Sequence, residues 1–497
     1  MSHIEHSTAP VPEPEREFTT LEGVAFMISG LGVQLSSELY AQWGTFFYSP
    51  SQGTNRIVYV SLSVVAVIFM AGRAFDVITD PLIGLWSDRT RTQPGRGRLF
   101  PIAGRRRPFI FWGSLLMTVT GIAFWYPPVA GESNVNLVYA TVLMSVHWGL
   151  YTLAYIPLLA LAPEIARTQR ERVRLGTWIA VGMTVGLVAS SVLPGALINI
   201  LDPARAAALA DGTEPVFSPI GYQRVAVIFA VVSLASFQFL VWAVRERHVE
   251  STQSSAVRPL RELSQAVALP VFRIYIFVFG FFYMGLLAMQ RAAPYWAVVG
   301  LGGDESTMTT LGVPFMIVSL LSVMICPWLG RRFELKWLVF FALAVVSLGL
   351  PLTYVIAKLN VPDSTKVVLA MVLYGSKGIG LGFMYVLVTP LMGEIIDQDA
   401  ERFGARREAV FNSLHAVMVK SAQIISILIA TTTMDVFGNS VERPTGALLV
   451  GPIGGAICLV GLAAALFYPV LNPISRSGDT AGPAGDSRER KEPIPDE

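Results

Sequence analysis

Charged residues are scarce in this sequence, and so are cysteines. Only 14% of the 497 residues are Asp, Glu, Lys or Arg, whereas a soluble domain carries about 25%. The formal net charge of +2 gives no support to general nucleic-acid binding, which needs a strong positive field. Cys326 and Cys458 lie in apolar segments and form neither a disulfide framework nor a zinc pattern. With 53% hydrophobic residues, the composition indicates an all-α polytopic membrane protein.

Motifs of the common enzyme classes are missing too. The chain has no phosphate-binding loop with its lysine, no His-Glu-x-x-His and no nucleophile elbow. We therefore predict that it is not an enzyme and uses no cofactor. Residues 1–20 are rich in Pro and Glu and lack the charged-then-apolar order of a signal peptide, so we expect them to form a cytoplasmic tail.

What the chain has instead is a series of apolar segments of about 20 or more residues, long enough to cross a bilayer. Six precede and six follow a polar, arginine-containing stretch. Two sets of six helices around a basic linker are typical of the major facilitator fold. The predicted spans are 22–48, 57–87, 107–127, 136–163, 174–201, 222–244, 271–299, 307–330, 336–357, 365–395, 408–437 and 446–471. The predicted organisation is a tail at 1–20, a six-helix half at 21–244, a linker at 245–270, a second half at 271–471 and a disordered cytoplasmic tail at 472–497.

Arginines gather in the loops that follow even-numbered spans. Examples are the loops at 88–107, 167–174 and 402–407, whereas the odd loops at 127–136 and 300–306 are nearly neutral. Because Lys and Arg are retained on the cytoplasmic side, we predict that both termini are cytoplasmic in a multi-pass protein of the inner (plasma) membrane.

Three charged residues interrupt the second predicted span. Arg73, Asp76 and Asp80 are spaced i, i+3 and i+7 and so share one stripe of a helix. A charge at the bilayer centre costs about 2.5–3.5 kcal/mol, so this stripe is predicted to face protein or a water-filled cavity on an ion or substrate pathway. Two carboxylates one turn apart suit a sodium ion, which prefers oxygen ligands. They equally suit a proton, because burial favours the neutral carboxyl. The alternative is a structural ion pair with Arg73.

Several separate segments resemble one transporter family. They are Gly84–Arg89 with the arginines that follow it, Asp76–Pro81, Ser87–Arg91, Gly104–Ile110, Tyr155–Pro157 with Ala162–Glu164, Gly393–Asp397, and Arg406–Glu408 with Lys420. Together they resemble the melibiose-carrier-like glycoside–pentoside–hexuronide:cation symporter family of the major facilitator superfamily. The resemblance covers residues 22–471. It implies symport of a glycoside or uronide with Na+ or H+ by alternating access, with the cation held near Asp76, Asp80 and Lys420.

The sequence departs from that family at two points. Melibiose-type members contact the sugar with an aspartate in helix 1 and another in helix 4, and those positions here are Gln34 and Tyr155. Galactoside recognition is therefore not implied. The arginine motif of the loop between helices 2 and 3 occurs twice, at Gly95–Pro101 and Gly104–Phe109, and the sequence leaves open which copy is functional.

Polar residues in other apolar spans are candidate substrate ligands. Gln34 and Glu38 are spaced i, i+4 and share a stripe of the first span. His147, Tyr151 and Tyr155 have the same spacing and share a stripe of the fourth span. Arg291 and Lys377 lie deep in apolar segments of the second half, which leads to the hypothesis of an acidic solute such as a uronide. Alternatively, they pair with first-half carboxylates, and the polar stripes make interhelical hydrogen bonds. The full candidate set is Gln34, Glu38, Arg73, His147, Tyr151, Tyr155, Arg291, Lys377 and Asn412, and His147 is also a candidate proton carrier.

Charged residues at the cytoplasmic ends of the spans are predicted to form a gate. They are Asp88, Arg89, Glu164, Glu394 and Asp397, and plain positive-inside charge is the alternative reading of the first two. The expected partners are a small-molecule solute and membrane lipid but no nucleic acid, and the chain is expected to be a monomer. No metal is expected beyond Na+ at Asp76 and Asp80. Two other functions stay open: a carrier of an amphipathic organic anion such as a lysolipid, and a non-transporting sensor or assembly factor with the same fold.

Overall fold

The structure is a computed structural model that describes residues 18–90, 102–166, 168–213, 217–246, 259–404 and 407–468. Several predictions lie wholly or mostly outside these residues. They are the N-terminal tail, the tail at 472–497, the central part of the linker, and the first arginine motif at Gly95–Pro101.

Every secondary-structure element in the described part of the chain is a helix. Inside a bilayer the backbone has no water to bond, so an apolar segment satisfies its own N–H and C=O groups by forming a helix. The elements are α1 (Thr20–Leu39), the π-helical η1 (Tyr40–Gly44), α2 (Thr45–Tyr48), α3 (Leu62–Arg89), α4 (Arg107–Ala123), α5 (Asn134–Ile165), α6 (Gln169–Ile200), α7 (Pro203–Ala210), α8 (Ile220–Ala243), α9 (Pro259–Ala268), α10 (Pro270–Tyr295), the π-helical η2 (Trp296–Gly300), α11 (Glu305–Gly330), α12 (Leu335–Lys358), α13 (Asp363–Phe403), α14 (Glu408–Phe437) and α15 (Thr445–Leu466).

Within the described residues, 10 helices are long and apolar enough to cross a membrane. They are α3, α5, α6, α8, α10 with η2, and α11 to α15. The multi-pass prediction is therefore confirmed. The first and third predicted spans coincide with α1 to α2 and with α4, which has 17 residues. For these two segments the count of twelve stays a prediction.

Several boundaries differ from the predicted ones. α6 begins at Gln169 and α13 ends at Phe403, against the predicted 174 and 395. α3 begins at Leu62, because the amides of Tyr59 and Val60 donate to the carbonyl oxygen of Tyr48 (2.9 and 3.0 Å) and hold this segment as a loop. The predicted linker contains the short helix α9.

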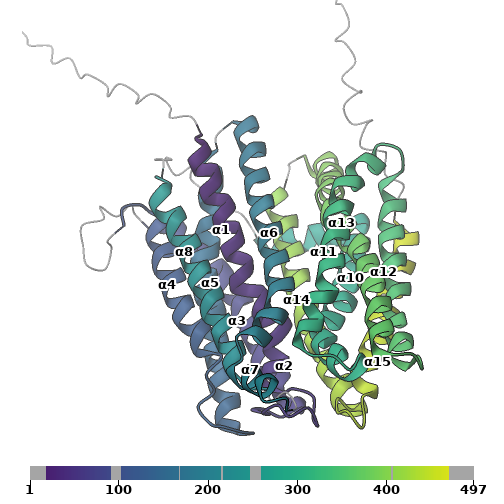
Figure 1. The fold of residues 1–497 in the computed structure, drawn as a ribbon. Helices are drawn as coiled ribbons and strands as arrows, with labels where there is room; N and C mark the ends of the chain where they lie inside the picture. The colour runs from purple at the N-terminus through teal and green to yellow at the C-terminus, as the bar shows by residue number, and fades with distance from the viewer. Residues whose placement is uncertain are drawn as a thin grey trace, which may run out of the picture. The chain divides into compact units, whose positions relative to one another are not determined.

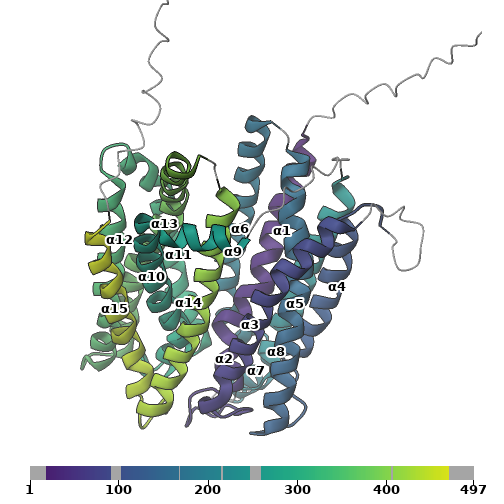
Figure 2. The ribbon, with the colours of Figure 1, turned by 180° about the vertical axis from the view of Figure 1, so that it is seen from behind.

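The chain divides into two compact units. The first contains 1–256 together with Gln290–Thr310 and Ile427–Ala447, and the second contains Val257–Met289, Leu311–Ser426 and Leu448–Glu497. In the first unit α1 packs against α6 and α8, while α5 packs against α3 and α4 (Figures 1 and 2). In the second unit α12 packs against α13.

The first unit has two distinct ends. Both views place the start of α1 at one end and α2 and α7 at the opposite one (Figures 1 and 2). We call the end that carries α2 and α7 the distal end. The π-helical segments η1 and η2 belong to this unit, and such segments occur often at functional sites.

Candidate functional site

The acidic pair of α3 is joined to α5 by a threonine. The Thr152 hydroxyl oxygen lies 2.7 Å from Asp76 Oδ1 and 3.1 Å from Asp80 Oδ1, within donating distance of both. Asp76 is 2% exposed and Asp80 is half-buried. The two carboxylates, four residues apart on one helix face, therefore turn toward α5, inside the first unit.

Arg73 contacts one of these two carboxylates. Its Nη1 lies 3.3 Å from Asp76 Oδ2, and its guanidinium stands 3.5 Å from the centroid of the Trp148 ring. A cation over an indole face gains electrostatic attraction when it is desolvated. The ion pair that the sequence offered as an alternative thus exists for Asp76, alongside the link to Thr152.

The chemistry of this cluster suits a small hard cation. Carboxylate and hydroxyl oxygens are the ligands that Na+ or a proton would meet here. Among the residues that the structure describes, no group of three or more His, Cys, Asp or Glu side chains is arranged to hold a metal ion. The oxygens of Asp76, Asp80 and Thr152 are the candidate cation ligands in the first unit.

A second polar cluster in the first unit joins α1 to the end of α10. Gln290 Nε2 donates to Glu38 Oε2 over 3.4 Å. Arg291 is 4% exposed, and its Nη1 donates to the carbonyl oxygens of Ala41 and Tyr40, both in the π-helical segment η1. Its Nε has no hydrogen-bond partner among the described residues. A donor buried without a partner is costly, which makes Arg291 a candidate binding residue.

The predicted polar stripe of the fourth span lies on α5, where its members make different contacts. Tyr151 and Tyr155 stack with ring centroids 5.3 Å apart. His147 is 2% exposed, and its ring nitrogens face the carbonyl oxygens of Met117 (3.3 Å) and Ser36 (3.2 Å). His147 thus bonds backbone between helices and is separate from the tyrosine pair.

The first stripe and the second unit hold the remaining solute candidates. Gln34 is half-buried, one turn before Glu38 on α1. In the second unit, Lys377 is 3% exposed and its Nζ stands 3.3 Å from the centroid of the Tyr374 ring. Lys420 is half-buried on α14, and Asn412 is exposed on the same helix.

The predicted gate residues of the first unit meet two arginines at the start of α4. Arg106 Nη2 lies 3.1 Å from Asp88 Oδ1, and its Nε lies 2.9 Å from Glu164 Oε1. Arg105 Nη2 lies 2.5 Å from the same Glu164 oxygen. Arg89, by contrast, is exposed. We call Asp88, Arg105, Arg106 and Glu164 the arginine cluster.

One carboxylate that the sequence reading did not single out holds this loop in place. Glu246 accepts hydrogen bonds from the backbone amides of Arg105, Arg106 and Arg107, the last two at 2.7 and 2.6 Å. Gly104 precedes them with φ +130, and a Cβ there would lie 2.6 Å from Glu246 Oε1. The second copy of the arginine motif, Gly104–Phe109, therefore builds the arginine cluster.

In the second unit the corresponding contact uses a different aspartate from the predicted one. Arg407 forms a two-pronged ion pair with Asp399, with Nε 2.8 Å from Oδ2, and its Nη1 donates to Gln265 Oε1 (2.8 Å). Asp399 is 0% exposed. Glu394 is half-buried and Asp397 is exposed on the same helix.

The family model described as MFS/sugar transport protein matches residues 25–471. The chain belongs to this family. It is therefore a membrane transporter and not an enzyme, as the sequence predicted.

Individual relatives of the transporter agree with this assignment. The isoprimeverose transporter of Lactiplantibacillus pentosus is 23% identical over 429 residues, 84% of this chain and 82% of the relative. The sodium-dependent lysophosphatidylcholine symporter 1 of Gallus gallus is 22% identical over 444 residues, 82% of this chain and 79% of the relative. A crystal structure of a mutant nucleoside transporter NupG superposes with a TM-score of 0.61 at 11% identity, covering 90% of this chain and 99% of that chain. This likeness confirms the major facilitator fold.

Several residues of the transporter's polar clusters escaped the sequence reading, among them Thr152, Gln290, Glu246 and Asp399. Thr152 follows Tyr151 by one residue, so the periodicity of the tyrosine stripe pointed to a different face of α5. Glu246 and Asp399 stand in stretches rich in charge, where no spacing marks one carboxylate over another. Thr152 could have been found by asking which hydroxyl side chains of the fourth span can reach the acidic stripe of the second span.

Proposed function

We propose that the transporter couples the movement of a glycoside or uronide to Na+ or H+, that the cation binds at Asp76 and Asp80, and that Lys420 also takes part in cation binding. The observation that carries this proposal is the position of Thr152 between the two carboxylates. The isoprimeverose transporter, a relative over most of the chain, supports a sugar as the solute.

The geometry around Thr152 calls for a positive species. A threonine hydroxyl has one hydrogen to donate, yet its oxygen lies within 3.1 Å of both carboxylates. Two ionised carboxylates on one hydroxyl share that single hydrogen. A proton on one carboxyl would donate back to the hydroxyl oxygen, and a sodium ion would draw all three oxygens together. Either species neutralises part of the buried negative charge.

We place the solute beside Glu38, Gln290 and Arg291. The free Nε of Arg291 favours an oxygen-rich or acidic group, because guanidinium binds carboxylate in a fixed fork geometry. Gln290 and Glu38 offer the amide and carboxylate groups that bond sugar hydroxyls. The further proposed solute contacts are Gln34, Arg73, His147, Tyr151, Tyr155, Lys377 and Asn412.

Coupling then follows from alternating access. Cation binding removes charge at the α3–α5 contact, and a bound solute lets the protein change between its two access states. One monovalent cation moving down about 100 mV supplies about 2.3 kcal/mol, which sustains roughly fiftyfold accumulation. We propose that both termini are cytoplasmic in an inner membrane. We propose the arginine cluster in the first unit, and the Arg407–Asp399 pair with Glu394 and Asp397 in the second, as the gate residues of the cytoplasmic side.

The test is a solute screen by thermal shift on purified protein, in sodium or potassium buffers at several pH values. We expect a glycoside or uronide to raise the melting temperature only when Na+ or protons are abundant. This response should disappear in Asp76→Asn and persist in Asp211→Asn, which changes an exposed loop aspartate. Hits that bind equally well in Asp76→Asn would remove the cation site from the proposal.

A lysolipid is the second candidate solute, because the lysophosphatidylcholine symporter of Gallus gallus is nearly as similar over a nearly equal share of the chain. The same screen distinguishes the two. Stabilisation by a lysophospholipid below its micellar concentration, with no response to glycosides or uronides, would replace the sugar proposal. A purified protein that moves neither solute into vesicles would favour a sensor or assembly factor.

A further inference from the structure

The distal end of the first unit holds a charged cluster that plays no part in the site described above. Arg56 lies in the loop after α2 and Glu305 is the first residue of α11. Arg56 Nε lies 2.9 Å from Glu305 Oε1, and Arg56 Nη2 lies 2.9 Å from Glu305 Oε2. The Tyr222 hydroxyl donates to the same Oε1 over 2.8 Å. Both oxygens of this carboxylate are thus bonded by groups from the first six-helix half.

A second ion pair stands beside the first. Arg205 Nη2 lies 2.6 Å from Asp304 Oδ2. The Phe217 ring serves both arginines, with its centroid 3.8 Å from the Arg56 guanidinium and 5.4 Å from that of Arg205. Burial by itself would raise the pKa of Asp304. Hydrogen bonds from Ser306 and the charge of Arg205 outweigh burial and lower the pKa below its ordinary value, so this pair stays ionised at neutral pH.

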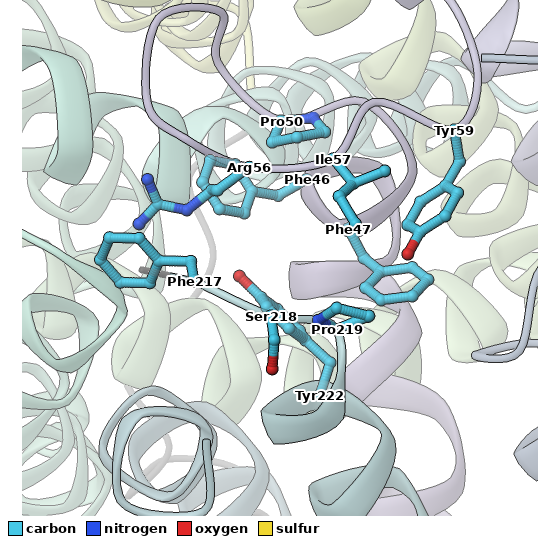
Figure 3. A pocket seen from close by; sticks show the side chains of 10 residues that line it. All are labelled: Phe46, Phe47, Pro50, Arg56, Ile57, Tyr59, Phe217, Ser218, Pro219 and Tyr222. Carbon is cyan, nitrogen blue, oxygen red and sulfur yellow. The ribbon is translucent and has the colours of Figure 1, made fainter. Parts of the chain in front are cut away.

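Aromatic side chains screen the inner pair from water. Figure 3 shows the Arg56 guanidinium facing Phe217 at the edge of a pocket that Phe46, Phe47 and Tyr222 also line. The side chains of Arg56 and Glu305 are only 7% and 0% exposed, against 16% and 22% for Arg205 and Asp304. A buried pair is stable only when its hydrogen bonds are complete, and removing one partner leaves a costly unpaired charge.

Glu305 lies in a helix that is divided between the two units. α11 starts in the first unit, whose segment Gln290–Thr310 ends inside this helix, and its remainder from Leu311 belongs to the second unit. The Thr309 hydroxyl adds a neighbouring contact, because it donates to the carbonyl oxygen of Val192 on α6 (2.5 Å). The start of α11 can leave the first half only if these contacts break.

We infer that Arg56, Tyr222 and Glu305 form the gate contact at the distal end, closed in this structure and broken once in each transport cycle. The inference rests on the alternating access of the proposed function, and the arginine distribution assigns this end to the outer face. Opening would uncover the surface of α6 under Thr309 and admit the solute from the distal end. The outer Arg205–Asp304 pair, being more exposed, contributes less to the closed state.

The test measures access instead of transport. Val192 is 8% exposed beneath Thr309, so Val192→Cys reports opening once the buried Cys326 and Cys458 are replaced by alanine. A water-soluble maleimide is added to the protein in nanodiscs, where both faces meet solvent. The labelling rate follows the open population when closing is faster than labelling.

We expect Glu305→Gln and Arg56→Gln each to raise the labelling rate by about tenfold or more, because each leaves one buried group unpaired. The double variant should label more slowly than either single one, since it removes both charges. Asp304→Asn is the matched control, and its effect should be smaller. A purely structural pair would lower the yield of folded protein and leave the labelling of the folded fraction unchanged.

Tyr222→Phe provides a milder variant should the charge changes prevent folding. It keeps the ring, removes one hydrogen bond to Glu305, and should raise labelling by about threefold. The gate proposal is wrong if a folded Glu305→Gln protein is labelled as slowly as the parent. If only Tyr222→Phe folds, parental labelling of that variant has the same meaning. The labelling experiment needs neither solute nor cation. A result against the gate can therefore be told apart from a thermal-shift screen that finds no coupled solute.

Discussion

At the scale of single residues, the link between α3 and α5 depends on one hydroxyl. Thr152→Val keeps the shape of the side chain and removes the group that bonds Asp76 and Asp80. Hydrogen bonds to charged groups contribute about 1.5–3 kcal/mol, so we predict a fall in cation affinity of roughly tenfold to a hundredfold. The cation concentration that gives half of the maximal thermal shift, in sodium and across pH, measures this change.

Thr79→Val is the matched control, because the Thr79 hydroxyl donates to the backbone oxygen of Asp76 in its own helix (3.2 Å). It removes the same group one residue before Asp80, and the cation response should stay as in the parent. Equal cation titrations for Thr152→Val and the parent would show that the hydroxyl only packs α5 against α3.

Arg291 carries a prediction about the solute. Arg291→Lys keeps the charge but loses the planar fork that reaches the carbonyl oxygens of η1 and leaves Nε for a ligand. We expect the KM for an acidic solute to rise about tenfold or more, with a smaller change for a neutral glycoside. Uptake into vesicles measures both, and Arg273→Lys, on an exposed position of the same helix, is the control. Equal losses for acidic and neutral solutes would contradict an acid-binding role.

Sequence periodicity located some site residues and missed others for a physical reason. Asp76 and Arg291 stand out because a charge in an apolar span is costly wherever it faces lipid. Thr152 is inconspicuous, since a threonine in a membrane helix can bond its own backbone, as Thr79 does. Thr152 gains its partners only because α5 packs against α3. The residue pattern of one helix does not show which neighbouring helix packs against it.

At the scale of elements, the start of α4 depends on a carboxylate from beyond the end of α8. Glu246 accepts from three backbone amides, those of Arg106 and Arg107 at the helix start, which the helix itself leaves without partners, and that of Arg105 just before it. We predict that Glu246→Ala and Gly104→Ala each lower the free energy of unfolding by about 1–3 kcal/mol. The thermal midpoint of each variant should fall accordingly. The double variant should be little worse than either single one, because both break the same contact.

The measurement for this element is the temperature at which half of the detergent-solubilised protein is lost from the monodisperse peak. Glu401→Ala, an exposed acid at the end of α13, is the control and should match the parent. Full additivity of the two changes would mean that Gly104 and Glu246 act on separate contacts.

Most long helices could be predicted because the bilayer fixes their length. The observed bounds of α5, α8 and α12 differ from the predicted spans by about two residues, since each apolar segment must cross about 30 Å. The loop before α3, the short helix α7 and the Glu246 contact obey no such constraint. They are set by tertiary partners, such as the Tyr48 carbonyl that holds Tyr59 and Val60.

At the scale of the whole molecule, the hydropathy pattern predicts two six-helix halves. It does not predict which side of the membrane the solute can enter from. The boundaries of the two units cross α11, because Gln290–Thr310 packs with the first half in this structure. Nothing in the apolar pattern of α11 marks its first turn as part of a gate. Arg56 is the one charge of its loop, and Glu305 follows Asp304 at the start of α11. The sequence pairs neither with the other, and only the contact between Arg56 and Glu305 in the structure brings them together.

The last prediction opens that end without changing a charge. Gly195 on α6 lies so close to the start of α11 that a Cβ would stand 2.2 Å from the carbonyl oxygen of Glu305. Gly195→Ala should push α11 away and raise the labelling of Val192→Cys about fivefold or more, as an overpacking cost of about 1 kcal/mol implies. Gly176→Ala is the matched control on the same helix, because no atom lies within 4 Å of its added Cβ. Both changes raise helix propensity equally, so only the difference between them reports the contact. If the two variants label at the same rate, the closed end tolerates the wedge and does not separate along α6 and α11.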